Sequence, residues 1–186
     1  DSKIYSDIEA SIKIFTENLG YSPQVFSYPF GEYSTNLKQI TSNLNFKYAF
    51  GQHSGAIDIT KDLLELPRFP INEKYGEIER FKSIINTLPF PYKNITPENR
   101  YLRNDENPPE VNIKFYDDLI DIKNITCYSN EGNKWRLSEI KFLNKNEILI
   151  LISEKFTTER GRINCSLLGN NGKWRWLGIQ YVIAEL

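Results

Sequence analysis

Apolar residues recur at three- and four-residue steps between residues 4 and 18, which is the spacing of one face of an α-helix. Gly20, in "LGYSP", suits the C-terminal cap of that helix. The same spacing predicts helices in "STNLKQITSNLNF" and "EIERFKSIINTL". Between them, "QVFSYPFGEYS" is expected to form a short strand that runs into a turn, and "KYAFG" and "LLELPRFPI" are expected to form strands. This alternation of helices and strands is typical of an α/β layer or barrel segment.

The pattern changes after residue 110. Short runs of alternating apolar and polar residues follow one another without a helix between them, and the turn signals "NEGN", "NKNE" and "GNNG" separate several of them. Several short strands in this order predict a β-sandwich. The expected strands are "VNIKFY", "NITCYS", "LSEIKFL", "EILILIS", "RINCSLL" and "WRWLGIQYVIA".

Five prolines and many polar residues fill the stretch between the two patterns, from Pro89 to Glu110. Such a composition is typical of a linker. The sequence therefore predicts three parts: residues 1–88 as the C-terminal portion of an α/β barrel, 89–110 as a linker, and 111–186 as an all-β, sandwich-like domain. Because three helices with so few strands cannot close a barrel, and because the chain begins at Asp1 and contains no Met, we expect it to be a piece of a longer protein.

The net charge of −1 gives no field that favours nucleic acid, and no apolar run approaches the length of a membrane span. Cys127 and Cys165 form no CxxC pair with a nearby histidine, so they do not predict a zinc site. They either pair with each other or lie buried as free thiols, and the burial typical of free cysteine favours the second alternative.

His53 is the single histidine of the chain and lies in the Gly-flanked loop "FGQHSG". It could act as an acid, a base or a substrate contact, but an ordinary loop histidine that bonds a nearby carbonyl is favoured. A tetrahedral zinc catalyst commonly takes two or three histidines, so we expect no metal ligands in this chain. Arg68 lies between two prolines in "ELPRFPIN" and either extends to solvent or binds a carboxylate.

Trp174 and Trp176 share one face of the last predicted strand. They either form an aromatic platform for sugar rings or belong to the sandwich core, and the core is favoured because that is where strand tryptophans usually lie. Exposure of both in a groove would favour a second function class, a carbohydrate-binding or interaction module that uses the C-terminal β-domain.

The stretch "VFSYPFGEYS" is unusually aromatic for a turn. Pro29 fixes one backbone angle and Gly31 permits conformations that other residues resist, so together they hold the peptide between Pro29 and Phe30 in one orientation. Such a corner can aim the Phe30 N–H at a fixed point, as an oxyanion hole requires. An aromatic turn that plugs a core is the alternative.

"FSYPFGEYS" resembles the third motif of polysaccharide deacetylases, the NodB-homology carbohydrate esterases. "LNFKYAFGQHSGAI", "LELPRFPINEKYG" and "RGRINCSLLGNNGKWRWLGIQYV" are similar, in order, to a later strand and loop, to the strand that carries an arginine, and to a β-domain attached to some bacterial members. The resemblance implies a distorted (β/α) barrel that hydrolyses N-acetyl or O-acetyl groups on a glycan.

The resemblance also implies a divalent metal, usually zinc, held by Asp-Asp and His-x-x-x-His motifs that would lie upstream of this chain. This chain alone is then expected to be inactive. By the same resemblance, Phe30 donates its backbone N–H to the oxyanion, and Arg68 orients a catalytic carboxylate. Tyr28, Pro29, Gly31 and His53 are expected to contact or position the acetylated polysaccharide. The position two residues before the proline is Ser27, where many members have arginine, and no motif for the general acid is visible.

Overall fold

The computed structural model describes residues 2–116 and 122–184. Residues 1, 117–121 and 185–186, which fall within the predicted parts 1–88 and 111–186, lie outside the described residues. The first part of the chain is a small α/β unit in which β1 pairs in parallel with β2, with Val25 opposite Tyr48. Two strands do not close a barrel. The elements are α1 (Ser2–Leu19), β1 (Val25–Ser27), the 3₁₀ turn η1 (Pro29–Gly31), α2 (Thr35–Asn43) and β2 (Tyr48–Phe50).

The three predicted helices are confirmed, and the first ends at the glycine that its sequence indicates. Gly20 adopts φ +76°, and its N–H bonds to the Thr16 carbonyl at 2.9 Å, which ends α1. Ser34 caps α2 by accepting a hydrogen bond from the Leu37 N–H at 3.1 Å. The third helix is α3 (Ile78–Ile85).

The strand predicted in "LLELPRFPI" is wrong. Only one bridge forms there, between Phe50 and Leu66, and the segment from 51 to 77 contains no helix or strand. Pro67 and Pro70 lack the N–H groups that a continuous ladder needs, so pairing stops at Leu66.

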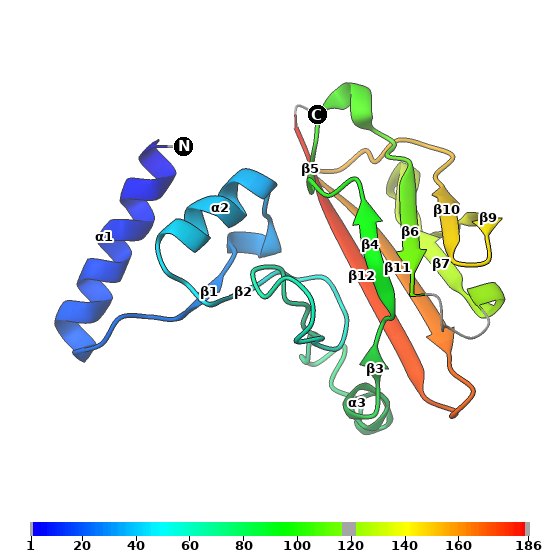
Figure 1. The fold of residues 1–186 in the computed structure, drawn as a ribbon, viewed down its shortest axis with the longest axis horizontal. Coiled ribbons are helices and arrows are strands. Elements are labelled where there is room, and N and C mark those ends of the chain that lie inside the picture. The colour runs from blue at the N-terminus through cyan, green and yellow to red at the C-terminus, as the bar shows by residue number, and fades with distance from the viewer. Residues whose placement is uncertain (1, 117–121, 185–186) are drawn as a thin grey trace.

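The second half of the chain is a sandwich-like arrangement of two mainly antiparallel sheets (Figure 1). One sheet has the order β4-β6-β10-β9, and the other has the order β3-β12-β11-β7-β8, with β5 also paired to β12. All six strands predicted after residue 110 are confirmed. The strands are β3 (Leu88–Pro89), β4 (Tyr92–Thr96), β5 (Tyr101–Leu102), β6 (Val111–Phe115), β7 (Thr126–Ser129), β8 (Arg136–Leu137), β9 (Glu139–Asn144), β10 (Glu147–Leu151), β11 (Arg160–Leu168) and β12 (Trp174–Ile183). Short 3₁₀ turns lie at η2 (Asn104–Glu106), η3 (Ile122–Asn124) and η4 (Glu131–Asn133).

One hydrophobic core fills the space between these two sheets. Along β6, β10 and β11 every second residue is buried, as expected for strands with one face turned inward. Both sheets contribute, for example Ile113 and Ile150 from one and Ile163 and Tyr181 from the other, and all four are fully buried. Burial of this apolar surface is the main stabilising contribution in this half of the molecule.

The expectation of free cysteines is wrong, because Cys127 and Cys165 form a disulfide. The two residues lie directly opposite each other in the antiparallel pairing of β7 and β11. Their side chains therefore lie close together on the same face of the sheet. The sequence does not reveal this contact, because it does not give the register of the two strands.

The expectation of a linker between residues 89 and 110 is also wrong. Residues 92–96 form β4, which pairs with β6, and Phe90, Ile95 and Leu102 belong to the core. The Asn107 side chain donates to the Phe156 carbonyl at 2.9 Å and accepts from its N–H at 2.9 Å. Prolines are tolerated here because β4 is an edge strand and β3 and β5 are only two residues long.

The α/β unit and the β half lie side by side, and the irregular segment 51–77 and α3 run between them (Figure 1). A bridge between Gly55 and Leu177, with the Gly178 N–H bonded to the Ser54 carbonyl at 2.6 Å, attaches this segment to β12. None of the helices in residues 2–116 and 122–184 is long and apolar enough to cross a membrane.

Candidate functional site

The Tyr-Pro-Phe-Gly corner forms the tight turn η1 directly after β1. Phe30 has φ +55° and Gly31 has φ +72°, so two successive residues lie in the left-handed region. For phenylalanine this conformation is uncommon and costs about 1–3 kcal/mol. Gly31 is buried, and a Cβ placed on it would come within 2.4 Å of the Gln52 backbone nitrogen. Both the backbone conformation and the close approach to Gln52 therefore require glycine at position 31.

Tyr28, which we expected to contact or position the substrate, lies buried beneath the corner. Its side chain is only 1% exposed, and its hydroxyl donates to the Leu64 carbonyl at 2.9 Å. Burial raises the pKa of this hydroxyl to about 12, so it stays protonated. Its ring stacks on that of Tyr33 at a centroid distance of 5.0 Å. Tyr28 thus fixes the position of Pro29 and Phe30, and Pro29 itself is exposed.

Phe30 is held from the other side by the β half. Its carbonyl accepts a hydrogen bond from the Gln180 side chain of β12 at 3.2 Å, and its ring lies 4.9 Å from the Arg160 guanidinium. Arg160 also forms an ion pair with Glu32. The Phe30 N–H donates to no acceptor among the described residues. The corner is therefore fixed on both sides, while the N–H group that we expect to act remains available.

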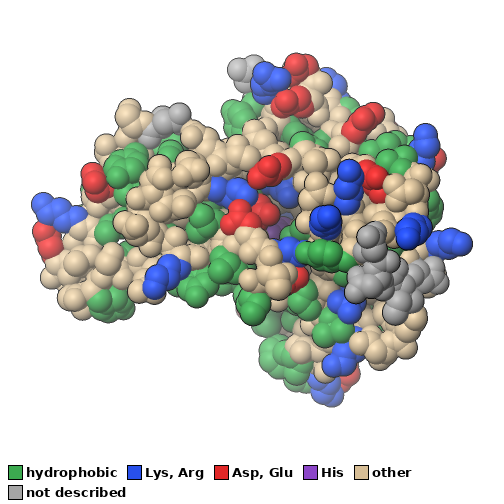
Figure 2. Space-filling model, viewed as in Figure 1, with side chains coloured by type: hydrophobic (Ala, Val, Ile, Leu, Met, Phe, Trp, Pro, Cys, Tyr) green, Lys and Arg blue, Asp and Glu red, His purple; other side chains and the backbone are tan. Residues whose placement is uncertain are grey.

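His53 lies behind the corner, one residue after Gln52. Burial lowers the pKa of its imidazole to about 4, and the nearby positive charge of Arg100 acts in the same direction. The imidazole is therefore neutral at pH 7. Its Nδ1 atom is buried and has no hydrogen-bond partner among the described residues. Figure 2 shows His53 between acidic and basic side chains where the α/β unit meets the β half.

A groove of about 790 Å³ lies between residues 52–80, which comprise the irregular segment and the start of α3, and the outer face of the sheet formed by β7, β11 and β12. This volume is in the range of small-molecule sites, roughly 300 to 1,000 Å³. His53 and Arg68 both line it, and Gln180 joins it to the carbonyl of Phe30. Tyr28, Pro29, Phe30 and Gly31 do not line the groove. The structure therefore brings two of the six expected site residues into the groove and places the corner at its end.

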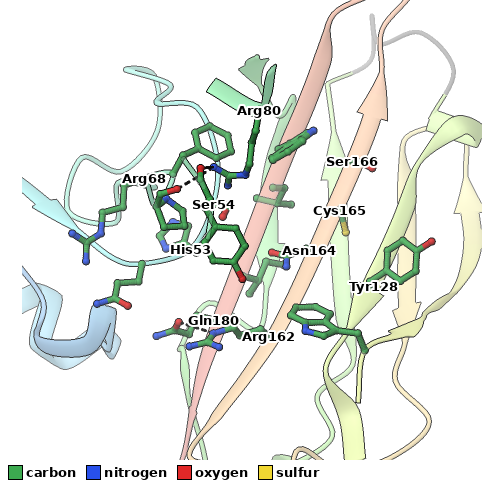
Figure 3. Close-up of a pocket in the computed structure, with 18 of the residues that line it drawn as sticks. His53, Ser54, Arg68, Arg80, Tyr128, Arg162, Asn164, Cys165, Ser166 and Gln180 are labelled. Atoms are coloured by element: carbon green, nitrogen blue, oxygen red, sulfur yellow. Dashed lines mark hydrogen bonds between the residues drawn. The ribbon is translucent and has the colours of Figure 1, made fainter. Parts of the chain in front are cut away.

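Arg68 and Arg80 shape one wall of the groove (Figure 3). The Arg68 side chain extends away from β12 toward the N-terminal part of the chain, and its backbone N–H bonds to the His53 carbonyl at 3.0 Å. The Arg80 guanidinium donates to the carbonyls of Pro70 and Tyr75 at 3.0 and 2.9 Å and lies 5.2 Å from the Tyr75 ring. Arg80 thereby holds the loop that carries Tyr75 in place.

The opposite wall consists of residues that we did not predict as part of a site. Because side chains alternate along a strand, the outward positions of β11 present polar groups while the inward positions enter the core. Figure 3 shows three of these outward residues together with the Gln180 side chain. The wall residues are Tyr128, Trp135, Arg162, Asn164, Ser166, Trp176 and Gln180. The polar half of the alternation in "RGRINCSLL" was a signal that could have found several of them.

The preference for Trp174 and Trp176 as core residues is wrong. Trp174 is 43% exposed, and Trp176 is half-buried and lines the groove, where its ring meets that of Phe69 at 5.3 Å. Both occupy the outward positions of β12, whereas Leu177, Ile179 and Tyr181 supply the core.

The charge of the groove has one sign. Among the described residues that line it, three are arginines (Arg68, Arg80 and Arg162) and none is Asp or Glu. The described residues include no cluster of three or more His, Cys, Asp or Glu side chains that could hold a metal ion. The residues present here therefore do not fit the metal that the family resemblance implies.

The fold and site define a class: an α/β unit with a rigid aromatic corner, joined to a sandwich-like β half across an arginine- and aromatic-lined groove. Residues 1–49 match the family model for polysaccharide deacetylase. The match contains the whole corner and confirms the resemblance over that part of the 186-residue chain. The family implies a carbohydrate substrate. No curated protein and no solved structure matches the chain.

Proposed function

We propose that this chain is part of a polysaccharide deacetylase that hydrolyses N-acetyl or O-acetyl groups on a glycan. The observation that carries this proposal is the geometry of the corner within the segment that matches the family. A strained left-handed Phe30, a Gly31 that no larger residue can replace, and a free Phe30 N–H together suit an oxyanion donor.

In the proposed reaction, the catalytic carboxylate takes a proton from water, whose oxygen bonds to the acetyl carbonyl carbon, and the carbonyl oxygen becomes negatively charged. The bond from this carbon to the sugar nitrogen or oxygen then breaks, the sugar atom takes up a proton, and acetate is released. The Phe30 N–H donates a hydrogen bond to the negatively charged carbonyl oxygen, and the stabilisation develops only as the charge develops. Loss of one such donor typically lowers kcat by about 10² to 10³. The rigidity of the corner matters because a donor that is already oriented requires no reorganisation during the reaction.

Arg68 serves in this proposal as the residue that orients a catalytic carboxylate, and its direction away from β12 supports that role. His53 is a weak candidate for the general acid, because an imidazole with a pKa of about 4 carries no proton to give at pH 7. The metal is an expectation from the family, and no step of this account passes through it.

The exposed face of α1 supports the proposal that further segments complete the α/β unit. None of its residues is buried, and Ile14 and Leu19 are 61% and 54% exposed. An amphipathic helix normally buries its apolar face against another element. We therefore propose that residues upstream of this chain cover α1 and supply the metal ligands.

Acetate release by the full-length protein tests the proposal. Gly31→Ala should lower kcat at least tenfold with KM nearly unchanged, because the displaced peptide no longer aims the Phe30 N–H. Phe30→Leu should cost less, since the donor is a backbone group. Gly20→Ala is the matched control, because Gly20 has a similar φ of +76° but no atom within 4 Å of the added Cβ.

Circular dichroism must show that each variant is folded. A folded Gly31→Ala variant that keeps the kcat of Gly20→Ala would reject the oxyanion role. A full-length protein that releases no acetate from any acetylated glycan would reject the deacetylase itself.

A second function, glycan binding by the β half, is favoured by the position of the aromatic residues. Trp176, Tyr128 and Trp135 line the groove instead of entering the core. Exposed aromatic rings beside hydrogen-bonding side chains are typical of ligand grooves. Binding of an oligosaccharide that Tyr128→Ala weakens, without acetate release, would support this second function over the first.

A further inference from the structure

The groove has features that neither the corner nor the family match explains. Its sheet wall carries Tyr128 and Trp135, which are 46% and 52% exposed, beside the polar side chains of Arg162, Asn164 and Gln180. Large aromatic side chains that remain solvent-accessible in a concave surface mark a ligand site more often than a structural one. Rings offer flat apolar surface, and the polar groups between them fix the orientation of a ligand.

The charge of the groove narrows the choice of ligand. The whole chain has a net charge of −1, yet the described residues that line the groove include three arginines and no carboxylate. Because the Arg68 side chain extends away from β12, this positive charge rests on Arg80 and Arg162. A cleft lined by one sign of charge concentrates the field and raises the local concentration of ligands of opposite sign. A neutral oligosaccharide would gain nothing from this arrangement.

Arg162 is the arginine best placed to bind such a ligand. Its Nε donates to the Gln180 side chain at 3.2 Å, which fixes the plane of the guanidinium, and no carboxylate forms an ion pair with it among the described residues. The two terminal nitrogens therefore keep their N–H donors for a ligand. A planar fork of this kind matches the paired oxygens of a carboxylate or a phosphate.

The link through Gln180 places this anion site next to the corner. One side chain accepts from Arg162 and donates to the Phe30 carbonyl, so the proposed oxyanion donor and the proposed anion site share a neighbour. We infer that the groove binds an anionic glycan, one that carries carboxylate or phosphate groups, and holds it along the β half while an acetylated sugar reaches the corner. This inference rests on the proposed function in taking the ligand to be a glycan and in placing its acetylated sugar at the corner.

Calorimetric titration of the full chain tests the inference. The three probes are an oligogalacturonate, a phosphorylated oligomannoside and a neutral chitooligosaccharide of equal length. At least one of the two anionic probes should bind about tenfold more tightly than the neutral one, a difference of about 1.4 kcal/mol. Its affinity should fall with added salt. The anionic probe that binds more tightly identifies whether carboxylate or phosphate is preferred.

Single-residue variants distinguish binding in the groove from a general effect of the positive charge of the protein. Arg162→Gln should weaken the anionic probe at least tenfold and leave the neutral probe unchanged, and Arg162→Lys should retain part of the binding. Arg103→Gln is the matched control, because it removes the same charge at an exposed site outside the groove. Tyr128→Ala should weaken all probes that bind, since ring contacts do not depend on ligand charge.

Equal affinity for the neutral and anionic probes, no binding of any probe, or equal losses for Arg162→Gln and Arg103→Gln would each overturn the inference. Acetate release by the full-length protein without anionic binding would leave the deacetylase standing and reject the groove. Binding of an anionic probe that depends on Arg162, without acetate release, would support the anion site in the groove and reject the deacetylase.

Discussion

The α/β unit and the β half are held together by different forces. Among the described residues, the core cluster of the β half contains nineteen buried hydrophobic residues, whereas that of the α/β unit contains three, Tyr28, Tyr33 and Ala49, beside the separately buried Ile40 and Phe46. The α/β unit therefore relies more on polar contacts than the β half does. Lys38 of α2, only 8% exposed, pairs with Asp62 at 2.7 Å and Glu65 at 3.1 Å.

The contacts between the two regions described here are polar, like those of Lys38. The α/β unit meets the β half through the Glu32–Arg160 ion pair and the Gln180–Phe30 hydrogen bond. From the segment between the two regions, Lys61 donates to the Tyr92 carbonyl of the β half. Apolar burial is insensitive to direction, whereas hydrogen bonds and ion pairs demand defined geometry. The β half is thus a stable base, and the polar contacts set where the corner lies on it.

The largest expected effect comes from the core of the β half. Ile163→Ala removes a fully buried side chain of β11 and should lower the free energy of unfolding by about 2–5 kcal/mol. Ile14→Ala, at 61% exposure on α1, should change it by less than about 0.5 kcal/mol. Urea unfolding checks both values, and similar losses for the two variants would contradict the division between the regions.

The disulfide should contribute slightly less to the free energy of unfolding than the Ile163 side chain does. Cys127 and Cys165 are 38 residues apart, and a closed loop of this length stabilises the folded state by about 2–4 kcal/mol through the unfolded chain. The double variant Cys127→Ala/Cys165→Ala should therefore unfold at lower urea concentration. Reducing agent should destabilise the wild type to a similar extent and leave the double variant unaffected. If the reducing agent destabilises the double variant as well as the wild type, its effect does not come from the disulfide.

Breaking the buried ion pairs of Lys38 should act on the α/β unit alone. Lys38→Met keeps the apolar stem but leaves Asp62 and Glu65 without their cation. The cost should be about 1–3 kcal/mol, below that of a fully buried pair because Asp62 is 41% exposed and regains water. Hydrogen exchange should accelerate in α2 and remain unchanged in β11 and β12. Lys13→Met, whose partner Glu17 is exposed, is the control and should have almost no effect.

The smallest expected effect is the pH dependence from His53. The pKa of about 4 of its imidazole in the folded protein lies below the ordinary histidine pKa of 6.5, so the unfolded chain binds the proton more readily. The stability is complete above about pH 6.5 and is lost as the pH falls toward 4, with about 1–2 kcal/mol gone by pH 5. His53→Gln should flatten this part of the stability curve in urea unfolding at pH 7 and pH 5. An unchanged slope would show that His53 is not desolvated in the folded protein.

The sequence by itself determined the local structure and the corner. Helical spacing and caps placed α1, α2 and α3, and alternation placed the six strands after residue 110, because both depend on residues close in the chain. The Pro29–Gly31 pair indicated a rigid turn because it restricts its own backbone. The same signals failed for residues 89–110. Their proline content predicted a linker, whereas the segment contains β4 and the core residues Phe90 and Ile95.

Only the tertiary structure decided which distant residues meet. The register of β7 on β11 brought Cys127 opposite Cys165, and the pairing of β11 with β12 placed Arg162 beside Gln180. Docking of residues 52–80 against the outer face of that sheet placed Trp176, which we expected in the core because strand tryptophans usually lie there, in a groove with Arg68. These contacts join residues far apart in the chain, and their geometry depends on packing that no local pattern encodes.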